Sequence, residues 1–219
     1  MGEAAIKMAS LLKYESAGTV EFLFDEKTKE FWFLEVNTRL QVEHPVTEEV
    51  TGIDLVREQL KIANGDPLSI SQDDVEIIGS SIEVRLYSED PGNDFLPVTG
   101  KLIAFDPCQE PLVRWDVGVE SGSEITPNFD PMLAKIISYG EDRIEAANKL
   151  ALALEKSHFG GLKTNRDYLI AILRSEEFLK GNTTTDFLNQ ANIKDEINLT
   201  KEEVLSVSYT HLTLPTIAV

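Results

Sequence analysis

The segment Phe33-Leu-Glu-Val-Asn-Thr-Arg-Leu-Gln-Val-Glu-His-Pro-Val-Thr47 carries polar side chains on alternate positions, with mostly apolar residues between them. Successive side chains of a β-strand point to opposite faces, so an extended chain would place all of these polar groups on one face. They are Glu35, Asn37, Arg39, Gln41 and Glu43. Two carboxylates, two amides and a guanidinium can bind a cation and an oxyanion side by side. The segment therefore predicts a strand that carries a reactive site.

The residues just before this segment predict a β-hairpin. Residues 18–24 and 31–37 are β-rich runs that flank a polar stretch. A turn centred near Thr28 would place Glu21 opposite Glu35, and like charges across a strand pair are destabilising. A bound Mg²⁺ would compensate them, because it takes oxygen ligands from carboxylates and phosphates. A turn displaced by one residue would instead point Glu21 to solvent, and the residues alone leave both interpretations open.

Motifs of one enzyme family continue in a fixed order along the chain. Beyond Glu21 and the run 35–43, they comprise residues 44–48, 51–60, 81–91, 95–101, 129–135 and 161–165. Over residues 1–190 the chain resembles biotin carboxylase, an ATP-grasp enzyme. The resemblance implies an α+β fold, with the C-terminal part of an ATP-grasp domain at residues 1–78 and a biotin carboxylase C-terminal domain at 79–190.

The resemblance assigns a metal and nucleotide site. The matching family positions hold the Mg²⁺ or Mn²⁺ ion that bridges the phosphates of ATP, and in this sequence they are Glu21, Glu35 and Asn37. Glu21 and Glu35 are therefore also expected to take part in binding ATP.

The resemblance places bicarbonate on the following residues. Arg39, Gln41, the backbone of Val42 and Glu43 match the family's bicarbonate-binding positions. Arg39 offers a planar fork of donors that suits a carboxylate-like anion. Glu43 is expected to be the general base that deprotonates bicarbonate, so that the anion can attack the γ-phosphate and form carboxyphosphate.

Arg85 is expected to act in a second step, on biotin. The matching family residue contacts the ureido oxygen of biotin and stabilises the enolate that forms when N1 loses its proton. Asp130 is expected to orient Arg85. Without the resemblance, the simpler interpretation of Arg85 is a strand arginine paired with Glu83 or Asp90. His44 precedes a proline and is expected to fix a turn, so it is left out of the catalytic set.

Local signals predict several elements. Thr51 and Asp54 resemble a capping box before a helix, whose inward face is expected at Leu55, Val56, Gln59, Leu60 and Ala63. In the second unit, short strands are expected at 82–87, 101–105, 112–117 and 135–139. An amphipathic helix is expected over 143–156, with Ile144, Ala147, Leu150 and Leu154 facing inward. Another helix should follow a capping pair at Thr164 and Asp167.

The two ends of the sequence carry their own signals. The N-terminal residues have helical spacing with no cap before them and no signal pattern. In the family that the chain resembles, the matching helix lies in the middle of the enzyme, so the resemblance implies the C-terminal half of a longer carboxylase. Residues 191–219 form a tail. Its last part, 206–219, contains no Asp, Glu, Lys or Arg and is interpreted as non-native read-through or as disordered.

Composition limits the possible partners. The chain has 219 residues and a formal charge of −18, which argues against nucleic acid, because nucleic-acid binding depends on clustered Lys and Arg. Cys108 is the single cysteine, so a disulfide or a cysteine metal site within the chain is excluded. No run approaches the length of a transmembrane helix, so no membrane partner is expected.

The expected function is ATP- and bicarbonate-dependent carboxylation of biotin on a separate carrier domain. Residues 95–100, 117–122 and 182–188 most resemble α subunits of acyl-CoA carboxylases, which work with a carboxyltransferase subunit in the cytoplasm, or in the mitochondrial matrix if the source is eukaryotic. Pyruvate and urea carboxylases share the same core and stay open as alternatives. A second alternative is an inactive fragment that only dimerises or docks a carrier domain. Arg114 matches a family dimer contact, although a surface salt bridge would explain it equally well.

Overall fold

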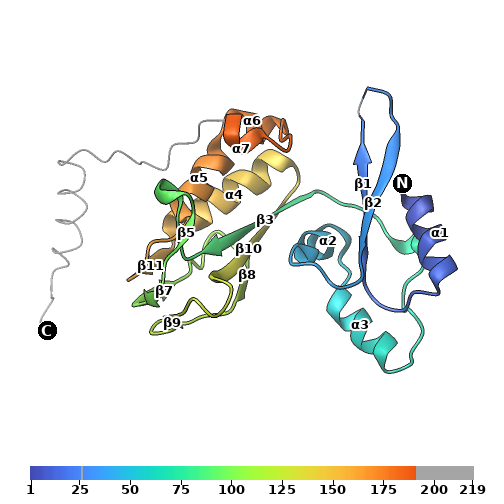
Figure 1. The fold of residues 1–219 in the computed structure, drawn as a ribbon, viewed down its shortest axis with the longest axis horizontal. Helices are drawn as coiled ribbons and strands as arrows, with labels where there is room; N and C mark the ends of the chain where they lie inside the picture. The colour runs from blue at the N-terminus through green and yellow to red at the C-terminus, as the bar shows by residue number, and fades with distance from the viewer. Residues whose placement is uncertain (26, 191–219) are drawn as a thin grey trace, which may run out of the picture.

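Helices and mostly short antiparallel strands make up residues 1–25 and 27–190, which are the residues that the computed structural model describes (Figure 1). This arrangement confirms the predicted α+β class. The predicted tail at 191–219, with its segment 206–219, lies outside the described residues. In the described part of the chain, no helix is long and apolar enough to cross a membrane.

The N-terminal part is built around a hairpin. Helix α1 (Gly2–Leu12) is followed by β1 (Thr19–Phe24) and β2 (Phe31–Asn37), which pair antiparallel. The Asp25 Oδ1 atom accepts a hydrogen bond from the Lys27 N–H at 2.8 Å and so closes the turn. The register places Glu21 opposite Glu35, with a bulge directly after Glu21. The predicted hairpin and its register are confirmed.

The prediction of a strand through Glu43 is wrong beyond Asn37. Strand β2 ends at Asn37, residues 38–43 form an irregular loop, and α2 (His44–Thr51) begins directly after it. Pro45 lies in the first turn of α2, where its missing N–H costs no helical hydrogen bond. Alternation of polar residues suggested a strand through Glu43, but the alternation continues through an irregular loop, and Pro45 lies in the first turn of the helix that follows.

Helix α3 (Leu55–Ala63) was predicted with the wrong cap and a partly wrong inward face, because Leu55 and Gln59 are half-buried but Val56, Leu60 and Ala63 are exposed. Its cap is Asp54, whose Oδ1 atom accepts from the Arg57 N–H at 2.8 Å, whereas Thr51 belongs to α2. Leu60 is 67% exposed, and the buried side chain is Glu58. Hydrogen bonds from Lys61 and Ser69 lower the pKa of Glu58 to about 2. The buried Glu58 therefore ties α3 to the segment after it through hydrogen bonds from Ser69, at a place where the sequence predicted apolar packing.

A three-stranded antiparallel sheet forms the centre of the second unit. Its order is β3 (Ser80–Tyr87), β10 (Met132–Gly140) and β8 (Arg114–Val117). The other strands pair in twos: β4 (Glu89–Asp90) with β5 (Leu96–Pro97), β6 (Gly100–Lys101) with β9 (Glu124–Ile125), and β7 (Ala104–Asp106) with β11 (His158–Gly160). Short 3₁₀ turns span Gln72–Asp74 and Pro91–Asn93. The remaining helices are α4 (Arg143–Lys156), α5 (Arg166–Arg174), α6 (Glu176–Lys180) and α7 (Phe187–Gln190).

The two faces of the three-stranded sheet have different chemistry. One face packs Leu86 and Ile136 against Leu150 and Leu154 of α4 in the hydrophobic core. The opposite face carries charged residues, because Arg85, Lys135 and Asp116 are partners across the strands. This charged face meets α2 and the loop before it. The sheet therefore joins a conventional core on one side to the polar residues of the N-terminal part on the other.

Helix α4 has the predicted bounds, but one of the residues predicted to face inward is exposed. Ala147, Leu150 and Leu154 have no exposed surface, as predicted, whereas Ile144 is 52% exposed. Asp142 caps the helix by accepting from the Glu145 N–H at 2.8 Å, so Ile144 lies in the first turn, near the edge of the covered face. The helix α5 has its cap at Asn165 rather than at the predicted Thr164.

We expect Leu154→Ala to lower the free energy of unfolding by about 2–5 kcal/mol, because it leaves a cavity in a core that has no exposed surface at this position. Ile144→Ala is the matched control, and its cost should stay near 1 kcal/mol or less, since half of that side chain is already in water. Urea unfolding of both variants measures the difference. Equal costs would contradict the assigned faces of α4.

Candidate functional site

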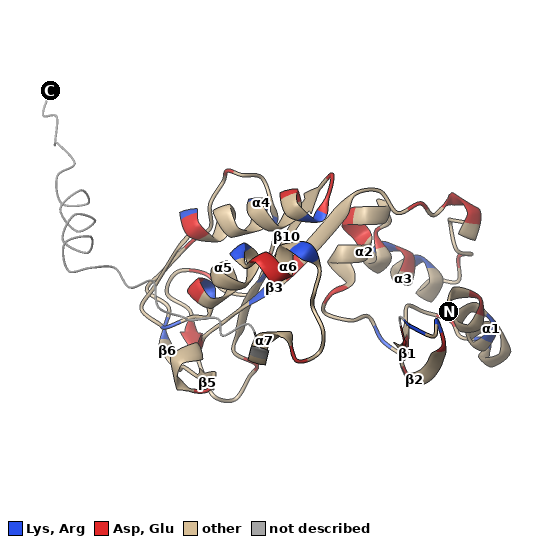
Figure 2. Cartoon of the chain, turned by 90° about the horizontal axis from the view of Figure 1, so that it is seen from above, with Lys and Arg blue, Asp and Glu red and all other residues tan. Residues whose placement is uncertain are grey.

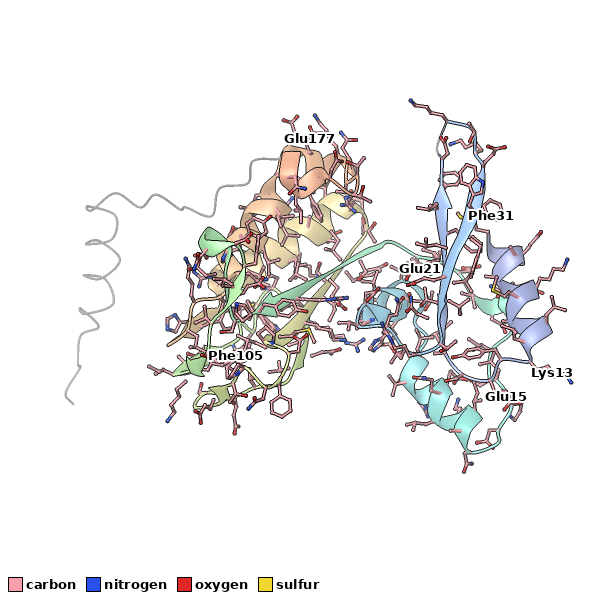
Figure 3. All side chains as sticks on the ribbon, viewed as in Figure 1. Lys13, Glu15, Glu21, Phe31, Phe105 and Glu177 are labelled. Atoms are coloured by element: carbon pink, nitrogen blue, oxygen red, sulfur yellow. The ribbon has the colours of Figure 1, made fainter. Side chains whose placement is uncertain are left out.

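The predicted metal-binding residues meet at the base of the hairpin. The Asn37 Nδ2 atom donates to Glu21 Oε1 at 2.7 Å and to Glu35 Oε1 at 3.0 Å, so both carboxylates converge on one amide. The Gln41 Nε2 atom also donates to Glu21 Oε1, at 3.3 Å. Figure 3 shows Glu21 on the side of the hairpin toward α2. The opposed carboxylates that the sequence predicted are therefore present, and side-chain amides compensate them here.

The donor set of this cluster fits a hard divalent cation. Two carboxylates and an amide that can turn its oxygen inward match the oxygen ligands that Mg²⁺ takes, with phosphates and water filling the other positions. In the described part of the chain, no group of three or more His, Cys, Asp or Glu residues is arranged to hold a metal. Two carboxylates and one amide leave further coordination positions of such a cation to other ligands.

The loop 38–43 brings the predicted bicarbonate residues next to this cluster. Arg39 and Glu43 are exposed, while Gln41 is half-buried and reaches Glu21. The Arg39 Nη1 atom donates to the Leu40 carbonyl at 3.3 Å. His44 Nδ1 lies 2.7 Å from the Gln41 carbonyl oxygen, which supports its predicted role in a turn. The loop therefore presents the Arg39 guanidinium and the Glu43 carboxylate to solvent, while Arg39 and His44 contact its backbone carbonyls.

Arg85 lies against Glu43, a contact that the sequence did not predict. Its Nη2 atom is 2.8 Å from Glu43 Oε2, while its Nε atom is 4.0 Å from Glu83 Oε1. Asp90, the other predicted partner, pairs with Lys163 instead. Asp130 Oδ1 accepts from the Met132 N–H at 2.9 Å, and in the described residues no ion pair joins Asp130 to Arg85. The structure thus joins the two predicted catalytic groups directly.

A cavity adjoins the loop on its α3 side. Its volume is about 740 Å³, and its lining includes Arg39, Gln41 and Glu43 together with Leu55 and Ile62 of α3. The predicted bicarbonate side chains therefore line a concave surface with both charged and apolar groups, as small-molecule sites usually have.

Sequence reasoning missed the charged side chains beneath the loop. The Lys135 Nζ atom donates to the Val42 carbonyl at 3.0 Å and lies 3.2 Å from Asp116 Oδ2. Burial raises the pKa of Asp116, but hydrogen bonds from Arg114 and Lys135 outweigh it, so that pKa lies below its usual value. The sequence analysis had no signal for them, because the cross-strand register of β10, which pairs Lys135 with Arg85 on one side and with Asp116 on the other, is visible only in the structure.

Glu83 was predicted only as a possible partner of Arg85, and its burial was not predicted. Its side chain is only 4% exposed, and both carboxylate oxygens are buried without a hydrogen-bond partner. Burial raises its pKa from 4.5 to about 7, against the opposing charges of Lys135 and Arg85. A carboxyl group whose pKa is raised to about 7 thus lies beside the ion pair of Arg85 and Glu43.

Arg114 connects the sheet to α2. Its Nη1 atom is 2.7 Å from Glu48 Oε2, and its Nε atom is 2.9 Å from Asp116 Oδ1. Glu48 in turn accepts from the Leu55 N–H at 2.8 Å, so the same carboxylate reaches the start of α3. Figure 2 shows acidic residues on both of these helices. For Arg114, a salt bridge within the chain, the alternative to a dimer contact, therefore has direct support.

Comparison with known proteins gives two family matches that follow each other along the chain. Residues 1–71 match the "Carbamoyl-phosphate synthase L chain, ATP binding domain" family. Residues 83–190 match the "Biotin carboxylase C-terminal domain" family.

Individual relatives agree with this order. Biotin carboxylase 2 of Bacillus subtilis is 48% identical over 190 residues, which are 87% of this chain and 42% of that protein. The human mitochondrial propionyl-CoA carboxylase alpha chain is 48% identical over 191 residues, which are 86% of this chain and 26% of that protein. The chain thus spans less than half the length of these relatives. A urea amidolyase and a pyruvate carboxylase are matched as well.

A solved structure supports the fold. The biotin carboxylase domain dimer of the 2-oxoglutarate carboxylase of Hydrogenobacter thermophilus, in complex with MgADP, ADP and bicarbonate, superimposes with a TM-score of 0.83 at 39% identity. The match covers 86% of this chain and 42% of that chain. The predicted resemblance is therefore confirmed at the level of family and fold.

We expect the free energy of unfolding to fall as the pH rises from about 4.5 through about 7, because the folded protein holds a proton on Glu83 that the unfolded chain releases. Glu83→Gln should remove this part of the slope and make the protein more stable than wild type at pH 8. Urea unfolding at several pH values measures it, with the exposed Glu15→Gln as control. A wild-type slope that survives in Glu83→Gln would contradict a protonated Glu83.

Proposed function

We propose, because this chain belongs to the biotin carboxylase family, that its residues 21–43 activate bicarbonate with ATP and that Arg85 helps to carboxylate biotin on a separate carrier domain. One observation carries the proposal: Asn37 joins the carboxylates of Glu21 and Glu35, Gln41 of the loop 38–43 reaches Glu21, and Glu43 of that loop meets Arg85 at 2.8 Å. Groups for a metal–nucleotide complex, an anion and a second substrate are thus contiguous. The domain boundary that fits this division lies between residues 78 and 79.

Glu21, Glu35 and Asn37 would hold Mg²⁺ or Mn²⁺, with the two carboxylates facing the phosphates of ATP. Such an ion would offset negative charge on the transferring phosphoryl group, which is a main task in phosphoryl transfer. The amide of Asn37, which contacts both carboxylates, keeps them oriented toward one point. Gln41, in the loop 38–43, donates to Glu21 and so couples the position of the proposed bicarbonate site to that of the proposed metal site.

Bicarbonate would bind on Arg39, Gln41 and the Val42 backbone, with Glu43 as the base. Arg39 is exposed and forms no ion pair in the described residues, so its guanidinium is available to an anion. Glu43 would take the bicarbonate proton, and the resulting oxyanion would attack the γ-phosphorus as the bond to ADP breaks. Carboxyphosphate and ADP would be the products. The exposed Glu43 carboxylate satisfies the requirement that a base can reach its proton.

Arg85 would serve both steps because of its place beside Glu43. As long as the ion pair exists, the guanidinium keeps the Glu43 carboxylate in place. It is 40% exposed, so it can also donate to the ureido oxygen of a biotin that a carrier domain presents. Asp130, two residues before β10, is our proposed further contact for that biotin.

The acceptor substrate is proposed from sequence likeness alone. Residues 95–100, 117–122 and 182–188 favour the α subunit of an acyl-CoA carboxylase, with a carboxyltransferase subunit and a homodimeric assembly as partners. The human propionyl-CoA carboxylase alpha chain and the yeast urea amidolyase are 48% and 49% identical, so overall identity does not separate the acceptors.

We expect Glu43→Gln in the full-length protein to lower bicarbonate-dependent ATP cleavage by about 100-fold or more, because general base catalysis typically contributes that much. MgATP should still bind, since Glu43 is not among its proposed ligands. Steady-state release of ADP and calorimetric titration with MgATP measure the two effects. Glu30→Gln, the same chemical change at the exposed hairpin turn, is the control. Near-normal turnover of Glu43→Gln would remove this residue from its role as base.

A further inference from the structure

Two neighbouring residues of the loop 38–43 are attached to the charged face of the sheet. The Lys135 Nζ atom donates to the Val42 carbonyl at 3.0 Å, and the Arg85 Nη2 atom lies 2.8 Å from Glu43 Oε2. Lys135 and Arg85 are direct partners across β10 and β3, so one cross-strand pair makes both attachments. The loop has no regular secondary structure of its own, and its position therefore depends on such contacts.

The two attachments differ in burial. The Lys135 side chain is 13% exposed, whereas those of Arg85 and Glu43 are 40% and 53% exposed. A buried hydrogen bond to a charged donor is stronger and better fixed than an exposed ion pair. The bond to the Val42 carbonyl is therefore the firmer of the two, and it holds the backbone rather than a side chain.

The surroundings of Lys135 favour this bond. Burying an ammonium group is costly unless opposite charges and acceptors are near. Asp116 lies 3.2 Å away on β8 and supplies the opposite charge. Neither oxygen of Glu83 forms a hydrogen bond, so Glu83 does not compete for the protons of Lys135.

We propose that Lys135 is a positioning residue that holds the Val42–Glu43 peptide in the orientation needed for bicarbonate. The inference rests on the proposed function and adds to it a residue outside the loop. A peptide group is planar, so fixing the Val42 carbonyl also fixes the direction in which the chain enters Glu43. It equally restricts rotation at Val42, whose backbone is proposed to contact the anion. Lys135 itself touches neither substrate.

The first test separates bicarbonate binding from ATP binding in the full-length protein. Lys135→Met should raise the KM for bicarbonate about tenfold or more, the usual effect of losing a charged hydrogen bond, and leave the KM for MgATP within about twofold. Lys135→Arg, which keeps a cation that can donate, should restore part of the loss. Equal increases in both KM values, or no change in either, would overturn the proposal.

A matched control is available in the same unit. The Lys149 Nζ atom donates to the Tyr139 carbonyl at 3.1 Å, on the other side of the sheet and away from the loop. Lys149→Met therefore removes the same kind of bond without touching the site. It should leave both KM values unchanged. An equal effect of the two substitutions would show that Lys135 acts only through stability and would overturn the proposal.

Amide hydrogen exchange tests the attachment without any activity. The N–H groups of His44 and Val46 donate to the carbonyls of Gln41 and Glu43, so they report on the end of the loop. Lys135→Met should speed their exchange about tenfold or more, while Lys149→Met should not. Unchanged exchange would overturn the attachment. If the wild-type protein cleaves no ATP with bicarbonate, the proposed function fails, and faster exchange in Lys135→Met would still support the attachment by itself.

Discussion

The attachment of an irregular loop to a charged sheet face is the constraint on which the candidate site depends. An exposed loop has no packing of its own to fix its side chains, and here Arg39, Gln41 and Glu43 all lie on one. Lys135 and Arg85 supply the missing anchors from neighbouring strands, while the hydrophobic core lies on the opposite face of the same sheet. The stability of the core and the geometry of the site are therefore linked through one layer of structure.

The hairpin and the sheet contribute different parts of the site. Strands β1 and β2 place Glu21 and Glu35 opposite each other, a pairing that is unfavourable unless amides or a cation compensate it. In the described residues, Asn37 and Gln41 do so. The sheet contributes a guanidinium and an ammonium beside the loop. Although the chain carries a net charge of −18, anions can meet a locally positive group here.

Sequence reasoning predicted the hairpin register from two β-rich runs and a turn centred near Thr28, because pairing across a short turn is set locally. It also predicted the bounds of α4, where apolar residues recur at helical spacing. It failed at residues 38–43, because the alternation of polar residues continues into a loop and Pro45 begins a helix instead. It assigned Leu60 to the inside of α3, but a buried Glu58 holds that helix through Lys61 and Ser69. The contact of Arg85 with Glu43 spans 42 positions, and no local pattern encodes such a pairing.

The central claim is that the loop 38–43 binds bicarbonate beside a metal held by Glu21 and Glu35. A crystal structure of the full-length protein with MgADP and bicarbonate tests it most directly. The account predicts bicarbonate oxygens within about 3 Å of the Arg39 guanidinium and the Val42 N–H, and Mg²⁺ on the two carboxylates. An anion bound away from Arg39, or a metal without either carboxylate, would contradict it.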